Sequence, residues 1–521
     1  MSSFKSQFNT GYVDYKGSLD LSPSQISIIV AILSAGTVVG ALMAAPIGDW
    51  MGRRISIIVS ICVFSFGVIF QVCADAIPML LAGRFFAGVG VGAVSVLVPL
   101  YQSEMAPKWI RGTLVCAYQL SITFGLLAAS VVNLLTQKME GPPAYRIPMG
   151  LQLTWACVLC LGLLILPETP RFLIKRGDKH GAGLSLSRLR RLDITHPALI
   201  DELAEIEANH EYELALGPAS YKDLFIGTPH LGRRTLTGCG LQMLQQLTGI
   251  NFIMYYGTTF FTGAGVSDPF LISLVMNVIN VVSTFPGLFV VETWGRRKLL
   301  IVGAIGMGVC QLVIAIFSTL VSDSESALVA KLLIVFVSVF VFFYAASWGP
   351  VAWVVTSEIY PLKVRAKSMS VSTASNWLLN FGIAYGTPFM VEEGSGYAAL
   401  GSKVFYVWGA FCVLAAIFVY GMIYETSKIS LEQIDEMYER VAFAWKSKDF
   451  EPSWSFQQLR DDGFADSGIP PPEHELQASR TTTTTSESVQ TIHTESSPTE
   501  SQSEEDKIIH QMGMSNVDFS Y

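Results

Sequence analysis

Charged residues are scarce in this sequence. Asp, Glu, Lys and Arg make up 15% of its 521 residues, whereas soluble globular proteins carry about 25%. Apolar residues make up 51%, and the mean hydropathy is +0.45. By length alone the chain could hold two or three soluble domains, but this composition indicates a polytopic membrane protein.

Other absences exclude further classes. Residues 425–521 hold 19 acidic and 7 basic residues, the net charge is −8, and no basic face for nucleic acid is visible. The eight cysteines fall in apolar stretches, and the one C-x-x-C pair, Cys157 and Cys160, is interpreted as apolar filler of a membrane helix. Residues 1–24 lack the apolar core of a signal peptide. No phosphate-binding glycine loop, metal-ligand spacing or nucleophile elbow is present, so we predict neither an enzyme nor a cofactor.

Long apolar runs predict the fold class, an all-α membrane protein. A membrane helix needs about 20 mainly apolar residues. Eleven runs meet this length: 26–48, 55–74, 77–102, 113–136, 148–166, 235–262, 269–291, 299–321, 332–356, 368–391 and 404–424.

Basic residues predict the orientation of these helices. One set of loops holds 20 Lys or Arg, and the opposite set, with the N-terminal segment, holds six. The first set comprises 49–54, 103–112, 167–234, 292–298 and 357–367. We therefore expect these loops to be cytoplasmic, the N-terminus to lie outside and the C-terminus inside.

The cytoplasmic segments carry two expected helices. Residues 201–208 predict a short surface helix, and Ser430 and Gln433 have the spacing of a capping box at the start of another. Residues 481–506 hold 14 Ser or Thr and 6 acidic residues with no apolar face, so we expect a disordered tail beyond about 460.

The chain repeats itself with a period near 250 residues. Three motifs recur in the same order: G-D-W-M-G-R-R at 48–54 as E-T-W-G-R-R-K at 292–298, S-E-M-A-P-K-W-I-R at 103–111 as S-E-I-Y-P-L-K-V-R at 357–365, and P-E-T-P at 167–170 as Y-E-T-S at 424–427. Parallel halves of this kind are a transporter architecture with the substrate site between them.

The repeat is incomplete. Helix 235–262 has its counterpart at about −8 to 19, which is partly absent and otherwise polar. We expect the first helix of the first half to be missing, through a start codon assigned too late or a truncated gene product; a true eleven-span protein is the alternative. The expected domains are an extracellular segment 1–24, a five-helix bundle 25–166, a cytoplasmic linker 167–234 with short helices, a six-helix bundle 235–424 and a cytoplasmic tail 425–521.

These motifs resemble the sugar-porter family of the major facilitator superfamily, in its fungal hexose-transporter branch. The resemblance covers about residues 20–440. Its further marks are F-A-G-V-G-V-G at 86–92, P-E-T-P-R-F-L at 167–173, Q-Q-L-T-G-I-N at 245–251, S-W-G-P-V-A-W at 347–353 and N-W at 376–377. The resemblance implies a major facilitator fold of two homologous helical bundles, here with eleven helices instead of twelve.

Amide side chains in the predicted helices suit a sugar. Asn and Gln both donate and accept hydrogen bonds without the desolvation cost of an ion. Gln242, Gln245 and Gln246 share one helix face by spacing, and Asn376 and Asn380 lie in the predicted helix 368–391. The alternative for any one amide is a hydrogen bond between helices. The resemblance implies sugar contact for Gln119, Gln245, Gln246, Asn251, Asn280 and Asn376, with a helix break near Gly249.

Apolar side chains would cover the faces of a sugar ring. The resemblance implies that Trp353 is a contact, and Tyr344 precedes it by nine residues on the same predicted helix. Ile122 is a weaker candidate beside Gln119. Lone aromatics in membrane helices otherwise serve packing or interface belts.

Arg84 is the one basic residue inside a predicted span. In proton-coupled members of the family a matching Arg pairs with an Asp on the first helix, which this sequence lacks. Asp14 and Asp20 do not match that position. Proton coupling is therefore left open, and the alternative is that Arg84 extends to the outer surface of the membrane.

Charged residues of the repeated motifs form a second candidate site. The resemblance implies a network that latches the two halves at the cytoplasmic side, whereas the alternative is simple marking of topology by the basic residues. Its members are Asp49, Arg53, Arg54, Glu104, Arg111 and Glu168 in the first half, and Glu292, Arg296, Arg297, Glu358, Arg365 and Glu425 in the second.

The leading hypothesis is transport of a monosaccharide, a hexose, by alternating access across the plasma membrane. The expected partners are the sugar, a proton if transport is coupled, the lipid bilayer, and a kinase or ubiquitin ligase acting on the tail. The alternatives are a hexose sensor that signals through its cytoplasmic tail, and an inactive truncated product.

Overall fold

The structure is a computed structural model. It describes residues 2–9, 11–12, 21–107, 110–215, 220–226, 230–263, 268–320, 326–391, 398, 400–427, 429 and 431–450. All regular elements in these residues are helical. The helices are α1 Ser2–Phe8, α2 Pro23–Met51, α3 Arg53–Val72, α4 Ile77–Met105, α5 Arg111–Thr136, α6 Pro143–Ile165, α7 Pro170–Lys175, α8 Lys179–Arg190, α9 Pro197–Ala215, α10 Asp223–Ile226, α11 Leu231–Leu247, α12 Ile250–Gly263, α13 Pro269–Thr293, α14 Arg296–Leu320, α15 Ser326–Phe343, α16 Gly349–Glu358, α17 Arg365–Val391, α18 Val404–Met422 and α19 Leu431–Arg440.

Nine helical segments in the described residues are long and apolar enough to cross a membrane. They are α2, α3, α4, α5, α6, α13, α14, the continuous run Lys331–Glu358 and the run Gly401–Met422. All nine match predicted spans. The first of them begins at a capping box, since Ser22 Oγ accepts from Gln25 N at 3.3 Å and Gln25 Oε1 accepts from Ser22 N at 3.0 Å.

The other two predicted spans are helical but differ from the nine. Between α11 and α12, Gly249 has φ of 85°, in the left-handed region, and the helix breaks there. Each piece is therefore shorter than a membrane crossing, as the resemblance implied for this position. Helix α17 is long enough, but Ser, Thr and Asn recur along it and lower its apolar content.

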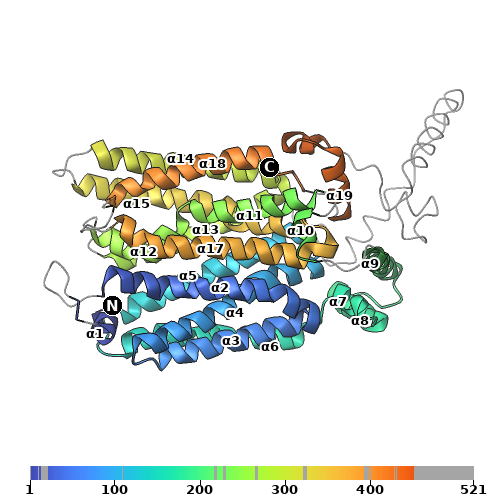
Figure 1. The fold of residues 1–521 in the computed structure, drawn as a ribbon, viewed down its shortest axis with the longest axis horizontal. Coiled ribbons are helices and arrows are strands. Elements are labelled where there is room, and N and C mark those ends of the chain that lie inside the picture. The colour runs from blue at the N-terminus through green and yellow to red at the C-terminus, as the bar shows by residue number, and fades with distance from the viewer. Residues whose placement is uncertain are drawn as a thin grey trace, which may run out of the picture. The chain divides into compact units, whose positions relative to one another are not determined.

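Glycines allow α2 and α4 to pack at close range. A Cβ on Gly40 would lie 2.8 Å from the carbonyl carbon of Val89, and one on Gly92 would lie 2.7 Å from the carbonyl carbon of Thr37. Larger side chains would force the helices apart, because in both cases the obstacle is backbone. The helices before the linker (the first half, residues 23–165) and those after it (the second half, residues 231–422) run alongside one another (Figure 1).

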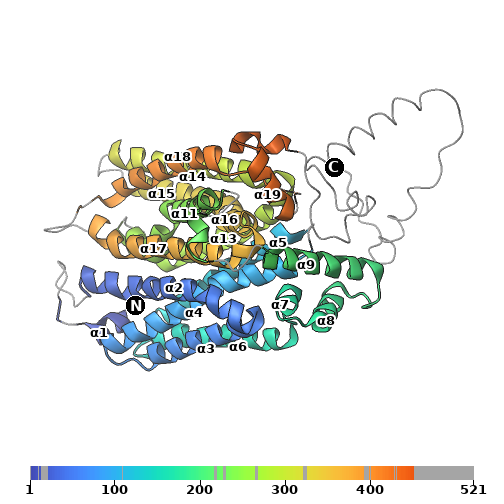
Figure 2. The same ribbon diagram turned by 45° about the vertical axis from the view of Figure 1, so that its right-hand side comes forward.

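The repeated motifs lie at one end of these helices, called here the basic end. Linker helices α7, α8 and α9 and tail helix α19 lie at the same end (Figure 2). The helix predicted at 201–208 is confirmed and extends over α9. The helix predicted after Ser430 is confirmed as α19, although Ser430 itself, like Asp14, Asp20 and the tail beyond 450, lies outside the described residues.

Candidate functional site

Six amide side chains join in one hydrogen-bonded cluster, called here the amide cluster: Gln242, Gln245, Gln246, Asn251, Asn376 and Asn380. Asn376 is its hub. Its Nδ2 donates to Gln242 Oε1 at 2.7 Å and to Gln245 Oε1 at 2.8 Å. Its Oδ1 accepts from Gln246 Nε2 at 2.7 Å. Every polar atom of this one side chain is therefore engaged.

Two helices position the cluster. The three glutamines project from one face of α11, as their spacing predicts, and meet Asn376 and Asn380 on α17. Gln245 Nε2 also donates to the carbonyl of Trp348 at 2.8 Å, which ties α11 to the π-helical turn Tyr344–Trp348. The break at Gly249 still leaves Asn251 within hydrogen-bond reach of Gln246.

The first half reaches the cluster through Ser34 and reaches residues beside it at two further points. On α2, Ser34 Oγ donates to Asn380 Oδ1 at 2.6 Å. On α4, Ser95 Oγ accepts from Trp377 Nε1 at 3.1 Å. On α5, Gln119 is buried against Gly349, where a Cβ would lie 3.2 Å from its Nε2. The cluster therefore sits where the two halves meet.

The remaining predicted contacts lie near this junction in different environments. Asn280, on α13, is buried and its Oδ1 has no hydrogen-bond partner in the described residues. Trp353 is buried on α16 and meets Tyr118 of α5 edge-on, with ring centroids 5.4 Å apart. Tyr344 is buried in the π-helical turn. Ile122 is 36% exposed, and no contact to the cluster is shown for it.

Arg84 lies on α4. The groups that act on it electrostatically in the described part of the chain are Tyr255 and Tyr256 of α12. Its Nε is buried without a hydrogen-bond partner there. Tyr255 also donates to Asn380 Oδ1 at 3.2 Å. One tyrosine therefore connects the neighbourhood of Arg84 with the amide cluster.

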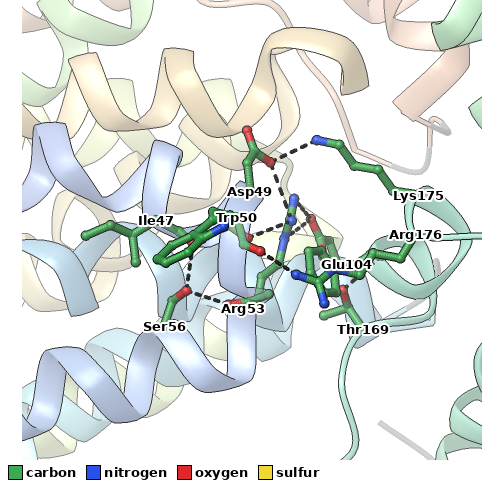
Figure 3. Close-up of polar contacts among 12 residues, drawn as sticks. Ile47, Asp49, Trp50, Arg53, Ser56, Glu104, Thr169, Lys175 and Arg176 are labelled. Carbon is green, nitrogen blue, oxygen red and sulfur yellow. Dashed lines mark hydrogen bonds and ion pairs between the residues drawn. The ribbon is translucent and has the colours of Figure 1, made fainter.

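The charged residues of the first half gather around Arg53 at the basic end (Figure 3). Its guanidinium pairs with Glu104 at 3.2 Å and with Asp49 at 3.5 Å, and its Nη1 donates to the carbonyl of Gly48. The Glu168 carboxylate accepts from the backbone N of Arg53 at 3.0 Å. Burial raises the pKa of Glu168, although backbone N–H groups oppose this shift.

The second half repeats this arrangement at the corresponding residues. Arg296 pairs with Glu358 at 2.9 Å and with Glu292 at 2.8 Å, and its Nη1 donates to the carbonyl of Val291. The Glu425 carboxylate accepts from the backbone N of Arg296 at 2.9 Å. The arginines that follow Arg53 and Arg296 in the sequence also correspond. Arg54 donates to the carbonyl of Leu163 and Arg297 to the carbonyl of Tyr420, both at 2.7 Å. The repeat inferred from the motifs is therefore also a repeat of contacts.

Each ion pair given above lies within one half. The halves meet at the start of α5, where a Cβ on Gly112 would lie 2.6 Å from Arg296 Nη2 and even closer to Glu292. A helix N-terminus favours a nearby carboxylate. Contact between the halves thus runs through a helix end as well as through the charged side chains that the sequence pointed to.

Several polar residues of the junction were not predicted as site residues. Ser34, Ser95 and Tyr255 hydrogen-bond at or beside the amide cluster, and Thr426 donates to Glu358 at 2.7 Å. Single hydroxyls are common in membrane helices, so no spacing distinguishes these residues. Thr426 follows directly after the repeated Glu425, and that position was the available signal.

Membrane-spanning helices in two repeated halves, with a polar cluster where the halves meet, define a transporter-type membrane protein. The chain belongs to the family described as "Sugar (and other) transporter", whose profile matches residues 1–438. This is a family of transporters rather than enzymes.

Individual proteins extend this comparison. The chain is 69% identical over 475 residues to the probable glucose transporter rco-3 of Neurospora crassa, covering 90% of this chain and 80% of that protein. It is 41% identical to the high glucose sensor RGT2 of Saccharomyces cerevisiae, covering 82% of this chain and 57% of that protein. The proton:xylose symporter XylE bound to 6-bromo-6-deoxy-D-glucose matches with a TM-score of 0.72 over 84% of this chain and 93% of that chain, at 24% identity. This last likeness shows the fold, that of the major facilitator superfamily.

Proposed function

We propose that this chain carries a hexose, with glucose as the first candidate, across the plasma membrane by alternating access. The observation that carries the proposal is the amide cluster. It offers neutral donors and acceptors at the junction of the halves, which is the chemistry that sugar hydroxyls need. The name of the Neurospora relative supports glucose as the substrate to test first.

The topology that goes with this function has eleven crossings. The nine apolar helical segments are joined by α11–α12 and by α17, which carry the amide cluster. The basic end faces the cytoplasm, because Lys and Arg concentrate in its loops.

Sugar binding would work by exchange of hydrogen bonds. Asn376 links Gln245 and Gln246 by hydrogen bonds of 2.8 and 2.7 Å. A hydroxyl that both donates and accepts can insert into such a link and satisfy both partners. Gln119, Asn251, Asn280 and Trp353 approach from α5, α12, α13 and α16 and complete the proposed contacts, with Tyr344 and Ile122 as further candidates.

The two charge groups would hold the basic end closed. Buried pairs such as Arg296–Glu358 keep the loops of one half in a fixed shape, and that shape presents Glu292 to Gly112 of the other half. Turning inward would separate this contact. Proton coupling through Arg84 is not part of this proposal, because the described groups that act on Arg84 are tyrosines and no carboxylate.

Uptake of labelled glucose tests the proposal. The chain is expressed in cells without their own hexose carriers, and surface abundance is measured in parallel. Saturable uptake above the empty-vector control, competed by unlabelled hexose, is the expected result. Protein at the surface with no uptake would reject transport by this chain.

The second candidate is a sensor, favoured by the identity to RGT2. A sensor would bind glucose at the same cluster and change the state of the tail without moving sugar. Binding of glucose to the purified chain, combined with no flux in proteoliposomes, would support this candidate over transport.

A further inference from the structure

A cavity lies at the basic end, away from the amide cluster. Its volume is about 90 Å³, and it is called here the mouth cavity. Three parts of the chain line it: the first half, the linker, and residues 363–367 at and just before the start of α17. The lining residues are Asp49, Arg53, Leu100, Glu104, Arg171, Phe172, Lys175, Ile206, His210, Lys363, Arg365, Ala366 and Lys367.

Positive charge dominates this lining. Six Lys or Arg side chains face two carboxylates. Both carboxylates are paired, Asp49 with Lys175 at 3.1 Å and Glu104 with Arg53 at 3.2 Å. Figure 3 shows Lys175 reaching from the linker to Asp49. The lining therefore carries four more positive than negative side chains, and an anion bound among them would reduce the repulsion between like charges.

The repeat shows what fills the equivalent position in the second half. In the second half, the Glu292 carboxylate packs on Gly112 in the first turn of α5. The equivalent pair by the repeat is Asp49 and Ala366, in the first turn of α17. Asp49 is one methylene shorter and is held by Lys175, and Ala366 adds a Cβ. The contact between a carboxylate and a helix N-terminus is thus replaced by a cavity.

We propose that the mouth cavity binds a phosphate group, which takes the place at the start of α17 that the Glu292 carboxylate takes at the start of α5. Arg171 and Lys175 would hold it from α7, and Lys363 and Lys367 from the second half. Arginine forks and lysine ammonium groups are the usual ligands of phosphate, and the N-terminus of a long helix adds to them. The ring of Tyr221 lies 5.5 Å from Lys367 Nζ and restrains that side chain.

The phosphate can come from a soluble polyphosphorylated compound or from the headgroup of an anionic lipid. In both cases it would bridge the linker and the start of α17. This ligand would therefore stabilise the closed basic end. The inference does not depend on which sugar the amide cluster takes.

The test measures binding to the purified full chain with two probes. One is inorganic tripolyphosphate, added to the chain in phosphatidylcholine nanodiscs. The other is a singly phosphorylated phosphoinositide, incorporated in the same nanodiscs. The cavity variant carries Arg171→Gln and Lys367→Gln. The control variant carries Arg188→Gln and Lys448→Gln, two exposed basic residues at the same end outside the cavity. Melting temperatures confirm that both variants are folded.

We expect the dissociation constant to rise at least about tenfold in the cavity variant, equal to about 1.4 kcal/mol, and to stay within about twofold in the control. This pattern with tripolyphosphate supports the site and a soluble ligand. The same pattern with the phosphoinositide alone supports the site and a lipid ligand. The proposal is overturned if neither probe binds, or if the two variants weaken binding equally.

Discussion

The two halves carry the same charge groups in unequal surroundings. Arg53 and Arg296 make corresponding contacts with carboxylates, backbone carbonyls and helix ends. In contrast, 11% of the most apolar stretch of α6 is buried. In its counterpart by the repeat, the run Gly401–Met422, the buried share is 39%. The buried share of the corresponding stretch is 39% in α3 and 56% in its counterpart α14.

The difference has a location. In the second half α11 and α12 pack against α17, α18 and their neighbours. In the residues that the structure describes, the first half has no long helix in the corresponding place. Short-range charge contacts need only the loop and the helix ends beside it, so they persist in both halves. Helix burial needs neighbours on every side, so it is not equal in the two halves.

The largest expected effect comes from the hub of the amide cluster, which only the second half supplies. Asn376→Ala leaves three glutamines without a shared partner, and each buried unsatisfied group costs about 1–3 kcal/mol. We expect hexose uptake to fall more than about tenfold, corresponding to about 1.4 kcal/mol or more, at normal surface abundance. Asn133→Ala, an amide of α5 outside the cluster, is the control. Uptake that survives Asn376→Ala would remove the cluster from the transport path.

Neutralising one carboxylate in each half tests whether the charge groups are equivalent. Glu358 pairs with Arg296 at 2.9 Å and also accepts from Thr426, whereas Glu104 pairs with Arg53 at 3.2 Å. Breaking a buried ion pair costs about 3–5 kcal/mol, so both Glu358→Gln and Glu104→Gln should slow transport.

We expect Glu358→Gln to slow transport more, and the double variant to slow it further, with surface expression unchanged. Initial uptake rates at equal surface abundance measure this. An unchanged rate in the double variant would reject the latch, and a larger effect of Glu104→Gln would reverse the ranking of the halves.

The glycines beside the charge groups offer a matched pair for stability. Gly52 and Gly295 have φ of 90° and 85°, and a Cβ on either would meet the carboxylate of Glu168 or Glu425. Backbone strain of this kind costs about 1–3 kcal/mol. Gly52→Ala and Gly295→Ala should therefore lower the melting temperature of the purified chain by similar amounts. Gly162→Ala, where a Cβ meets nothing within 4 Å, is the control, and a strongly unequal pair would contradict the repeat.

The smallest expected effect concerns Arg84 in the less buried half. Its described electrostatic neighbours are the tyrosines of α12 and no carboxylate. We therefore expect Arg84→Gln to leave uptake and its pH dependence nearly unchanged. Uptake measured between acidic and neutral pH checks this, and a lost pH dependence would show that Arg84 takes part in proton coupling.

Much of the fold followed from the sequence. Apolar runs located all nine candidate spans, because exclusion from water acts on segment length and composition. The spacing of Gln242, Gln245 and Gln246 placed them on one face of α11, since helix periodicity is local. The repeat paired Arg53 with Arg296, and the contacts confirmed that pairing.

The partners of these side chains did not follow from the sequence. Nothing local indicates that Asn376 closes the glutamine cluster, or that Ser34 reaches Asn380, because these contacts join residues 130 or more positions apart.

Composition, periodicity and the repeat thus determined that this chain is a helical membrane protein of two related halves with polar and charged sites. The tertiary structure alone decided where the halves touch and where they leave a cavity. The physical reason is that one methylene, Glu292 against Asp49, and one Cβ, Gly112 against Ala366, separate a packed contact from a cavity. Such differences act only once distant helices have been brought together.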